Sequence, residues 1–170
     1  YIEGLTLLEF YNQILVDNYD DNTLSINRII SVIILDILYA LRNIHGRGWV
    51  HNDLSLENIM ITDYEDIGTL ANGDYTKRPT ITIIDLDACE ECARTNTCME
   101  SQGPRVGFPK ARAESLAHGM SFNGLLSDIG SVGIAFNRIF EDLSEVYPDN
   151  TYSVYDEVVE KLMEEDMNYS

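Results

Sequence analysis

Residues 51–58 (HNDLSLEN) carry a carboxylate and an amide at a spacing that suits catalysis. Asp53 and Asn58 are five positions apart on one short segment, so their side chains can face the same space. In phosphoryl transfer, a carboxylate orients a hydroxyl nucleophile and accepts its proton, and an amide oxygen binds a magnesium ion. The spacing therefore indicates phosphoryl-transfer chemistry at this segment.

A second group of carboxylates, Asp85 and Asp87, follows the apolar run 80–84 (TITII). Magnesium prefers hard oxygen ligands, few of them from protein and the rest from phosphate and water. Asp85 beside Asn58 would complete such a site, and the metal would neutralise charge on phosphate oxygens. Asp87 either joins this site or faces solvent.

Each pattern is weak when taken alone. Residues 51–58 could instead form a simple turn in which Asp53 and Asn58 hydrogen-bond to nearby backbone groups. The two patterns occur together on either side of an expected β-hairpin, and this combination favours the catalytic interpretation.

A long helix is predicted just before the 51–58 segment. Apolar side chains recur there at steps of three or four residues and also fill the other faces, so a largely buried helix is expected over 26–46. Ser25 is its expected N-cap, and Gly46 and Gly48 are expected to end it.

The hairpin is predicted from two short β-branched runs, 59–62 (IMIT) and 80–84. A polar connection, 64–79, is expected to be a loop. Helices are also predicted over 5–16, 126–140 and 152–163, and a long functional loop over 88–110. The fold class expected is α+β and mainly helical.

The order of these features resembles the large, C-terminal lobe of the protein kinase superfamily over nearly the whole chain. The catalytic loop carries the resemblance most clearly, because it follows a buried helix and precedes a hairpin that ends in Asp85. The matching segments are 1–5 (end of the hinge), 26–46 (buried helix), 51–58 (catalytic loop), 85–114 (activation segment, with 85–87 at the D-F-G position), 126–140 (buried helix, with 128–133 resembling D-x-W-S-x-G) and 162–167 (resembling L-L-x-x-D-P).

The resemblance implies transfer of phosphate from ATP, with Mg²⁺, to a serine or threonine hydroxyl of a protein or peptide. It places functional residues at the catalytic loop, the hairpin and the hinge. The residues are Asp53, Ser55 and Asn58 for catalysis, Ile2, Thr6, Met60 and Asp85 for the nucleotide, and Asn58, Asp85 and Asp87 for the metal.

Supporting roles follow from the same resemblance. Asp128 would anchor the catalytic loop through its backbone amides, and His51 would pack beneath Leu86. Glu57 would either contact basic substrate side chains or simply face solvent. Two residues are interpreted from the sequence itself: His45 as stabilising a helix C-terminus, and Trp49 as part of the core.

Three departures make the chain an atypical member. Asn52 replaces the usual arginine, so a phosphorylated activation loop lacks a cation at this position. Ser55 replaces a lysine whose positive charge contacts the transferring phosphate. The loss of this charge is expected to lower the rate. Asp87 replaces the glycine of D-F-G, and a D-x-D triplet of this kind resembles small-molecule phosphotransferase sites and some fungal kinases.

Composition limits the partners. The 170 residues include 11 Lys and Arg against 29 Asp and Glu, a net charge of −18. Nucleic acid is therefore an unfavourable partner, whereas a basic peptide is a natural one; a solvated acidic surface is the plainer interpretation. The apolar segments are too interrupted for a membrane span.

The three cysteines, an odd number, argue for a reducing, intracellular location. Cys89, Cys92 and Cys98 could bind zinc with His118 as a fourth ligand, but the spacing matches no complete zinc motif, and unpaired thiols in a loop are favoured.

Three functions remain open from the residues. The first is a Ser/Thr-type protein kinase. The second is a pseudokinase that acts as a scaffold, favoured by Asn52, Ser55 and Asp87 and opposed by Asp53, Asn58 and Asp85. The third is a choline-kinase- or aminoglycoside-type phosphotransferase, which the segments 107–114 and 128–133 argue against.

The 170 residues contain no glycine-rich loop, strand lysine or helix glutamate, the parts with which kinases hold phosphates. The small N-terminal lobe is therefore expected to be missing, most simply because the sequence is cut from a longer one. The chain alone is predicted to bind ATP weakly and to transfer no phosphate. A radiolabelled-ATP assay on the purified 170-residue chain checks this, and robust turnover would contradict it.

Overall fold

The computed structural model describes residues 3–16, 23–91, 124–147, 157–158 and 160–161. Several predicted segments lie outside this part of the chain. They are most of the 85–114 segment, nearly all of the 152–163 helix and residues 162–167, together with Ile2, Cys92, Cys98 and His118.

The predicted long helix is present as α2 (Thr23–His45). Its inward side chains are almost fully buried and recur at helical spacing, as expected: Ile26, Ile29, Ile30, Ile33, Ile37 and Leu41. Ser25 lies inside the helix, so its prediction as N-cap was wrong. The helix ends before Gly46, whose N–H donates to Arg42 O at 2.9 Å, and Gly48 has a φ of 83°.

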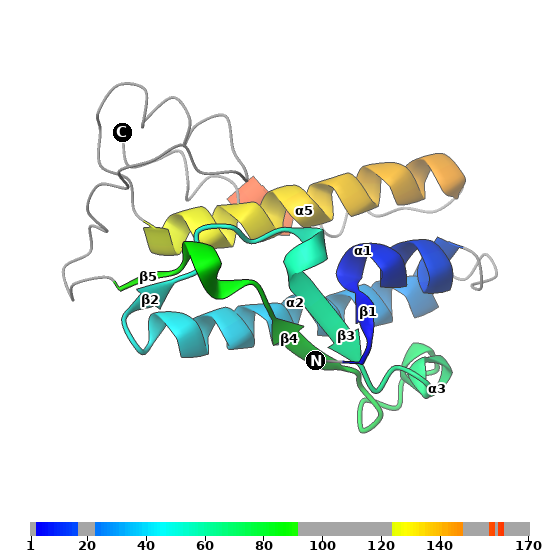
Figure 1. Cartoon of the computed structure of the whole chain (residues 1–170). Coiled ribbons are helices and arrows are strands. Elements are labelled where there is room, and N and C mark those ends of the chain that lie inside the picture. Colours follow the sequence, from blue (N-terminus) through cyan, green and yellow to red (C-terminus); the bar gives the residue numbers. More distant parts are fainter. Residues whose placement is uncertain (1–2, 17–22, 92–123, 148–156, 159, 162–170) are drawn as a thin grey trace.

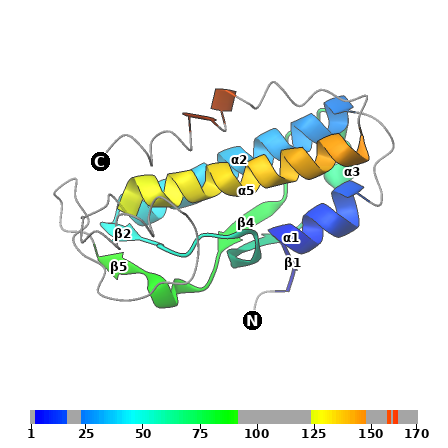
Figure 2. The ribbon, with the colours of Figure 1, turned by 90° about the horizontal axis from the view of Figure 1, so that it is seen from above.

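A second long helix, α5 (Gly124–Val146), is longer at both ends than the predicted 126–140. It buries Val132, Phe136, Ile139 and Leu143. Figures 1 and 2 show α5 alongside α2 and running in the opposite direction, with the start of α5 next to the end of α2. The two apolar helix faces therefore share one core.

The predicted hairpin is confirmed. Strand β3 (Ile59–Thr62) pairs antiparallel with β4 (Thr80–Ile83), with Ile59 opposite Ile83. A third strand, β1 (Leu5–Thr6), pairs with β3 to give the order β1-β3-β4. Gly4 is needed for this approach, because a Cβ there would lie 2.6 Å from Ile61 O.

The helix predicted over 5–16 starts two residues later than expected. Thr6 caps α1 (Leu7–Phe10) in a reciprocal capping box with Glu9, which holds Thr6 itself in extended backbone. The chain continues as a π-helical segment, η1 (Tyr11–Val16).

The hairpin connection is not a plain loop, as 64–79 was predicted to be. It contains a short helix, α3 (Ile67–Ala71), whose apolar side chains are buried and which packs on α2. Arg28 of α2 donates to Ala71 O at 2.9 Å, and Arg78 pairs with Asp36 at 3.4 Å. Five residues are too few to show a helical period in the sequence.

A second, two-stranded sheet joins β2 (Trp49–Val50) to β5 (Glu90–Glu91). Short 3-10 turns, η2 (Leu56–Asn58) and η3 (Leu86–Ala88), precede β3 and follow β4. The described part of the chain is thus a mixed helix-and-strand, α+β structure. None of its helices has the length and apolar character that crossing a membrane requires.

Replacement of Ile37 by alanine is predicted to lower the free energy of unfolding by about 2–5 kcal/mol. The reason is that Ile37 is fully buried in the core that α2 and α5 share, so the smaller side chain leaves a cavity. Urea denaturation followed by circular dichroism measures the change. Leu35→Ala is the matched control on the same helix, since Leu35 is 45% exposed. Equal losses for the two variants would contradict this account of the core.

Candidate active site

The 51–58 segment is held by one buried carboxylate. Asp128, on α5, is 1% exposed and accepts hydrogen bonds from the backbone N–H of His51 and of Asn52, each at 2.8 Å. The His45 ring, at the end of α2, lies 2.9 Å from the same carboxylate. The predicted anchoring role of Asp128 is confirmed.

His45 lies in the last turn of α2, as predicted. Its ring also contacts Asp128 on α5, a partner that the sequence did not reveal. A buried carboxylate is costly unless nearby donors replace its lost hydration, and three N–H groups do so here. Asp128 therefore ties together the end of α2, the start of α5 and the loop.

Asp53 and Asn58 face each other within the loop, as predicted. Asn58 Nδ2 donates to Asp53 O at 2.8 Å and lies 3.4 Å from Asp53 Oδ2. The η2 turn brings them together, with Asn58 N–H donating to Ser55 O at 3.1 Å. Both side chains are partly exposed. Asn58 Oδ1 accepts no hydrogen bond from any residue in the described ranges, so it is available to a ligand.

Asp85 is brought next to this loop by the hairpin. The N–H of Ile84 donates to Asn58 O at 2.9 Å, one step beyond the β3-β4 ladder. The backbone then turns into the left-handed region at Asp85, with a φ of 60°, and its side chain is exposed. Such a conformation is unfavourable for most residues and is maintained by surrounding contacts.

His51 supplies one of those contacts. It is fully buried, and its Nε2 lies 2.9 Å from Ile84 O. A carbonyl oxygen can only accept, so Nε2 carries the proton and donates. His51 was predicted to pack under the D-F-G position, against Leu86. It bonds to the backbone directly before that triplet, and the Leu86 side chain is 60% exposed.

The other predicted residues are distributed as follows. Met60, on β3, is buried opposite Thr6, on β1. The Thr6 hydroxyl donates to Glu9 Oε2 at 2.9 Å, and its oxygen accepts from Glu9 N–H, so it serves as a helix cap. The Thr6 backbone N–H also donates to Glu9 Oε2, at 2.8 Å, and this bond, followed by the one from the Thr6 hydroxyl, lowers the pKa of the exposed Glu9 carboxyl. Ser55 lies in extended backbone just before η2.

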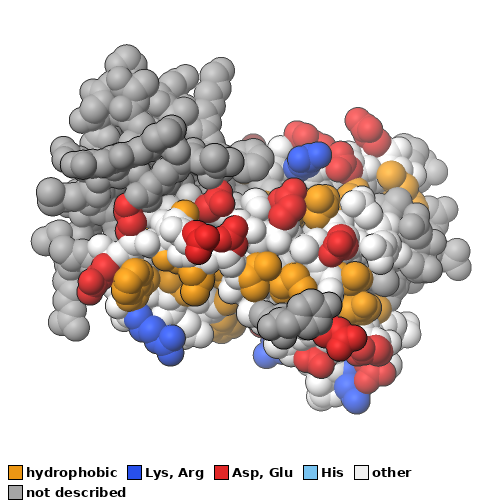
Figure 3. All heavy atoms as spheres, viewed as in Figure 1, with side chains coloured by type: hydrophobic (Ala, Val, Ile, Leu, Met, Phe, Trp, Pro, Cys, Tyr) orange, Lys and Arg blue, Asp and Glu red, His pale blue; other side chains and the backbone are white. Residues whose placement is uncertain are grey.

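The surroundings of the loop are acidic. Asp87 and Glu57 are exposed, and Figure 3 shows acidic side chains spread over this face of the molecule. Burial, followed by the charges of Asp128 and Asp85, raises the pKa of the Cys89 thiol. Among the described residues, no group of three or more His, Cys, Asp or Glu side chains is arranged to hold a metal ion.

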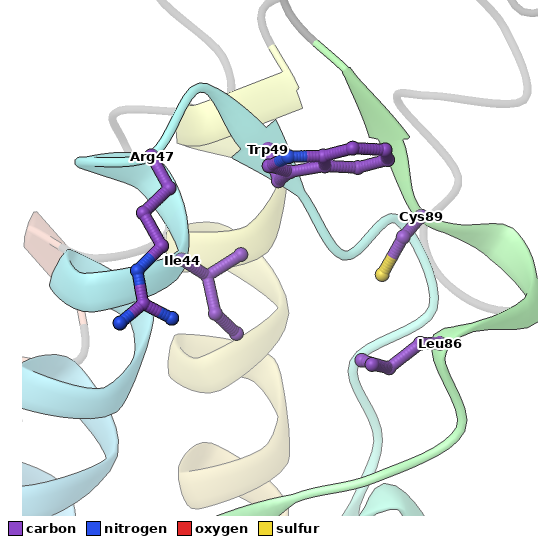
Figure 4. Close-up of a pocket in the computed structure, with 5 residues that line it drawn as sticks. All are labelled: Ile44, Arg47, Trp49, Leu86 and Cys89. Atoms are coloured by element: carbon purple, nitrogen blue, oxygen red, sulfur yellow. The ribbon is translucent and has the colours of Figure 1, made fainter.

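A pocket of about 390 Å³ lies beside the 85–88 turn and is largely apolar (Figure 4). Trp49, predicted as core, forms part of its wall and is 43% exposed. None of the candidate catalytic or metal residues lines this pocket, so it is separate from the candidate site. The lining residues are Ile44, Arg47, Trp49, Leu86 and Cys89.

Sequence reasoning missed the role of Asn52 and the strand β5. Asn52 was interpreted only as the loss of a cation, and residues 90–91 only as part of the long loop predicted over 88–110. Asn52 Nδ2 in fact donates to Ala88 O at 3.1 Å. Strands of two residues are too short for an alternating pattern, so no signal in the sequence reveals the β2-β5 pair.

Comparison with known proteins relates the chain to a protein family and to a curated relative. The family described as fungal protein kinase matches residues 22–108, which include the 51–58 loop and the 85–87 triplet. The serine/threonine-protein kinase PRR1 of Saccharomyces cerevisiae (strain ATCC 204508 / S288c) is 26% identical over 116 residues, which cover 67% of this chain. The aligned region is 22% of the length of that relative.

Asp128→Asn is predicted to lower the free energy of unfolding by about 2–4 kcal/mol. The new amide NH₂ would point at a backbone N–H that now bonds to a carboxylate oxygen, so both donors would be left without an acceptor. Chemical denaturation measures this loss. The exposed Glu145, on the same helix, provides the control: Glu145→Gln should change stability by less than about 0.5 kcal/mol. A stable Asp128→Asn protein would show that the loop is not held as described.

Proposed function

Because the chain belongs to the fungal protein kinase family, we propose that it is the catalytic-loop lobe of a kinase that transfers phosphate from ATP to a serine or threonine hydroxyl. The observation that carries the proposal is the junction of loop and hairpin. The Asn58 side chain bonds to Asp53 O, and the Asn58 carbonyl accepts from the N–H of Ile84, the residue before Asp85. Asp53 and the backbone leading into Asp85 are therefore both next to Asn58.

Asp53 is the proposed catalytic residue. Its carboxylate would orient the acceptor hydroxyl and take its proton as the phosphoryl group moves. The bond from Asn58 Nδ2 to Asp53 O fixes the loop on either side of that carboxylate. Most of the rate enhancement in such reactions comes from positioning and from electrostatic stabilisation rather than from covalent chemistry.

Asn58 and Asp85 are the proposed magnesium ligands, with Asp87 as a further one. Their side chains are partly or fully exposed and offer hard oxygen atoms, which suits an ion that takes few ligands from protein. When bound, Mg²⁺ would offset the charge of the ATP phosphates. The protein's own part is to hold Asp85 in its left-handed turn beside Asn58.

The nucleotide is proposed to lie over the β1-β3 pair. Thr6 and Met60 are directly opposite each other there, and Ile2 precedes β1 in the sequence. Ser55 would face the transferred phosphate with a hydroxyl where a lysine is usual. The acidic surroundings favour a basic protein or peptide as acceptor, and Glu57 is exposed beside the catalytic loop.

The activity is proposed for the whole protein and not for these 170 residues, since the chain spans 22% of its relative's length. In this proposal residues 1–170 form the large lobe, and a small lobe outside this sequence supplies the phosphate-holding parts. An intracellular location is proposed from the odd number of cysteines.

A scaffold without catalysis is the second candidate. The observation in its favour is that both usual cations of the loop are replaced, by Asn52 and Ser55. The neighbouring Asp53, Asn58 and Asp85 favour the enzyme, since a scaffold has no need of them. The small-molecule alternative is favoured most by Asp87.

Asp53→Asn is predicted to lower kcat at least about 100-fold in the full-length protein, because the base that takes the hydroxyl proton is lost. Asp85→Asn should instead raise the Mg²⁺ concentration needed for half-maximal rate. Phosphate transfer to basic and neutral serine peptides, measured across a Mg²⁺ series, tests both. Asp63→Asn, in the exposed turn after β3, is the control. Undiminished transfer by both site variants would refute this assignment.

A further inference from the structure

Asn52 is buried and uncharged, and its backbone adopts an uncommon conformation. It is 2% exposed and has a φ of 66°. Asparagine enters this left-handed region more readily than most residues with a side chain. The backbone conformation by itself accounts for an asparagine at this position. A further role depends on the contacts of the side chain.

The Asn52 side chain reaches the segment that follows the candidate metal ligands. Its Nδ2 donates to Ala88 O at 3.1 Å and makes a longer contact of 3.5 Å with Glu90 Oε2. Ala88 ends η3, and Glu90 begins β5. The backbone N–H of Asn52 is meanwhile held by Asp128 at 2.8 Å. The amide is thus attached to the anchored loop and reaches out to the turn.

Consecutive residues hold opposite ends of this turn. The His51 ring donates to Ile84 O at 2.9 Å, just before Asp85, and the Asn52 amide donates to Ala88 O, just after Asp87. Only three residues separate the two bound carbonyls, and a chain segment this short has little freedom when both ends are fixed. Within the turn, Cys89 N–H donates to Leu86 O at 3.0 Å.

We infer that Asn52 is a positioning residue, whose side-chain amide fixes the Asp85–Asp87 turn against the catalytic loop through the Ala88 carbonyl. The inference rests on the proposed function, in which Asp85 and Asp87 bind Mg²⁺. A neutral amide bonded to a neutral carbonyl needs no charged partner. The turn is therefore held in place without an ion pair at residue 52, and without a phosphate group to complete one.

The first test measures the turn directly, by amide hydrogen exchange of peptides covering residues 86–91 in the 170-residue chain. Asn52→Gly keeps the left-handed backbone accessible and removes only the side chain. It is expected to speed exchange about fivefold or more, since one hydrogen bond at the end of the turn is lost. Asp63→Gly is the matched control, because Asp63 also has a positive φ, of 54°, and lies in another turn.

A second variant separates the amide from mere space-filling. Asn52→Asp has nearly the same size and also tolerates a positive φ, but it places a carboxylate opposite the Ala88 carbonyl. Exchange as fast as in Asn52→Gly is expected. If Asn52→Asp retains the slow exchange of the unsubstituted chain, the side chain acts by packing and the inference is overturned.

The activity readout uses the full-length protein. Asn52→Gly is expected to raise the Mg²⁺ concentration for half-maximal phosphate transfer at least about threefold, as expected from the loss of one hydrogen bond, with a smaller change in kcat. An unchanged Mg²⁺ requirement would overturn the positioning role. If the unsubstituted protein transfers no phosphate, the proposed function fails, whereas the exchange comparison still decides whether Asn52 holds the turn.

Discussion

The buried carboxylate of Asp128 is the constraint on which the rest of the site depends. A charge with 1% exposure is tolerable only if donors surround it, and they come from the end of α2 and from the loop backbone. The apolar faces of α2 and α5 bring the helices together, and this carboxylate sets the relative position of their adjoining ends. The same bonds determine the shape of the loop at His51 and Asn52.

The hairpin and the loop hold each other at several points. One hydrogen bond beyond the β3-β4 ladder joins the N–H of Ile84 to Asn58 O. In the other direction, the side chains of His51 and Asn52 donate to the backbone carbonyls on either side of the Asp85–Asp87 turn. Asp85 and Asn52 both have positive φ, which costs free energy in isolation. Hydrogen bonds from other elements hold the backbone at or next to both residues, and such contacts maintain a strained backbone.

The sequence was most informative where a pattern extends over many residues. The isoleucine spacing from Ile26 onward predicted α2, and the β-branched runs predicted β3 and β4. The kinase resemblance pointed to Asp128 as the anchor. The roles of Asp53, Asn58 and Asp85 in catalysis stay predictions, although their neighbourhood agrees with them.

Short elements and individual exposures could not be predicted. The five residues of α3 and the two-residue strands β2 and β5 hold too little sequence for a period, and their positions are decided by contacts with distant residues. The nucleotide role of Thr6, which follows from the hinge resemblance, stays a prediction, and its capping bonds with Glu9 could not be foreseen from that resemblance. Trp49 was assigned to the core, yet it forms part of the wall of a pocket and is 43% exposed.

That position gives Trp49 an optical consequence. It is the chain's single tryptophan, it is 43% exposed, and it shares its pocket with Leu86 and Cys89 at the candidate metal-binding turn. Indole emission depends on the polarity of its surroundings and is quenched by nearby thiols. The tryptophan emission of this chain, excited selectively above the tyrosine band, therefore originates from one site beside the turn that carries Asp85, and it reports on that turn without any added label.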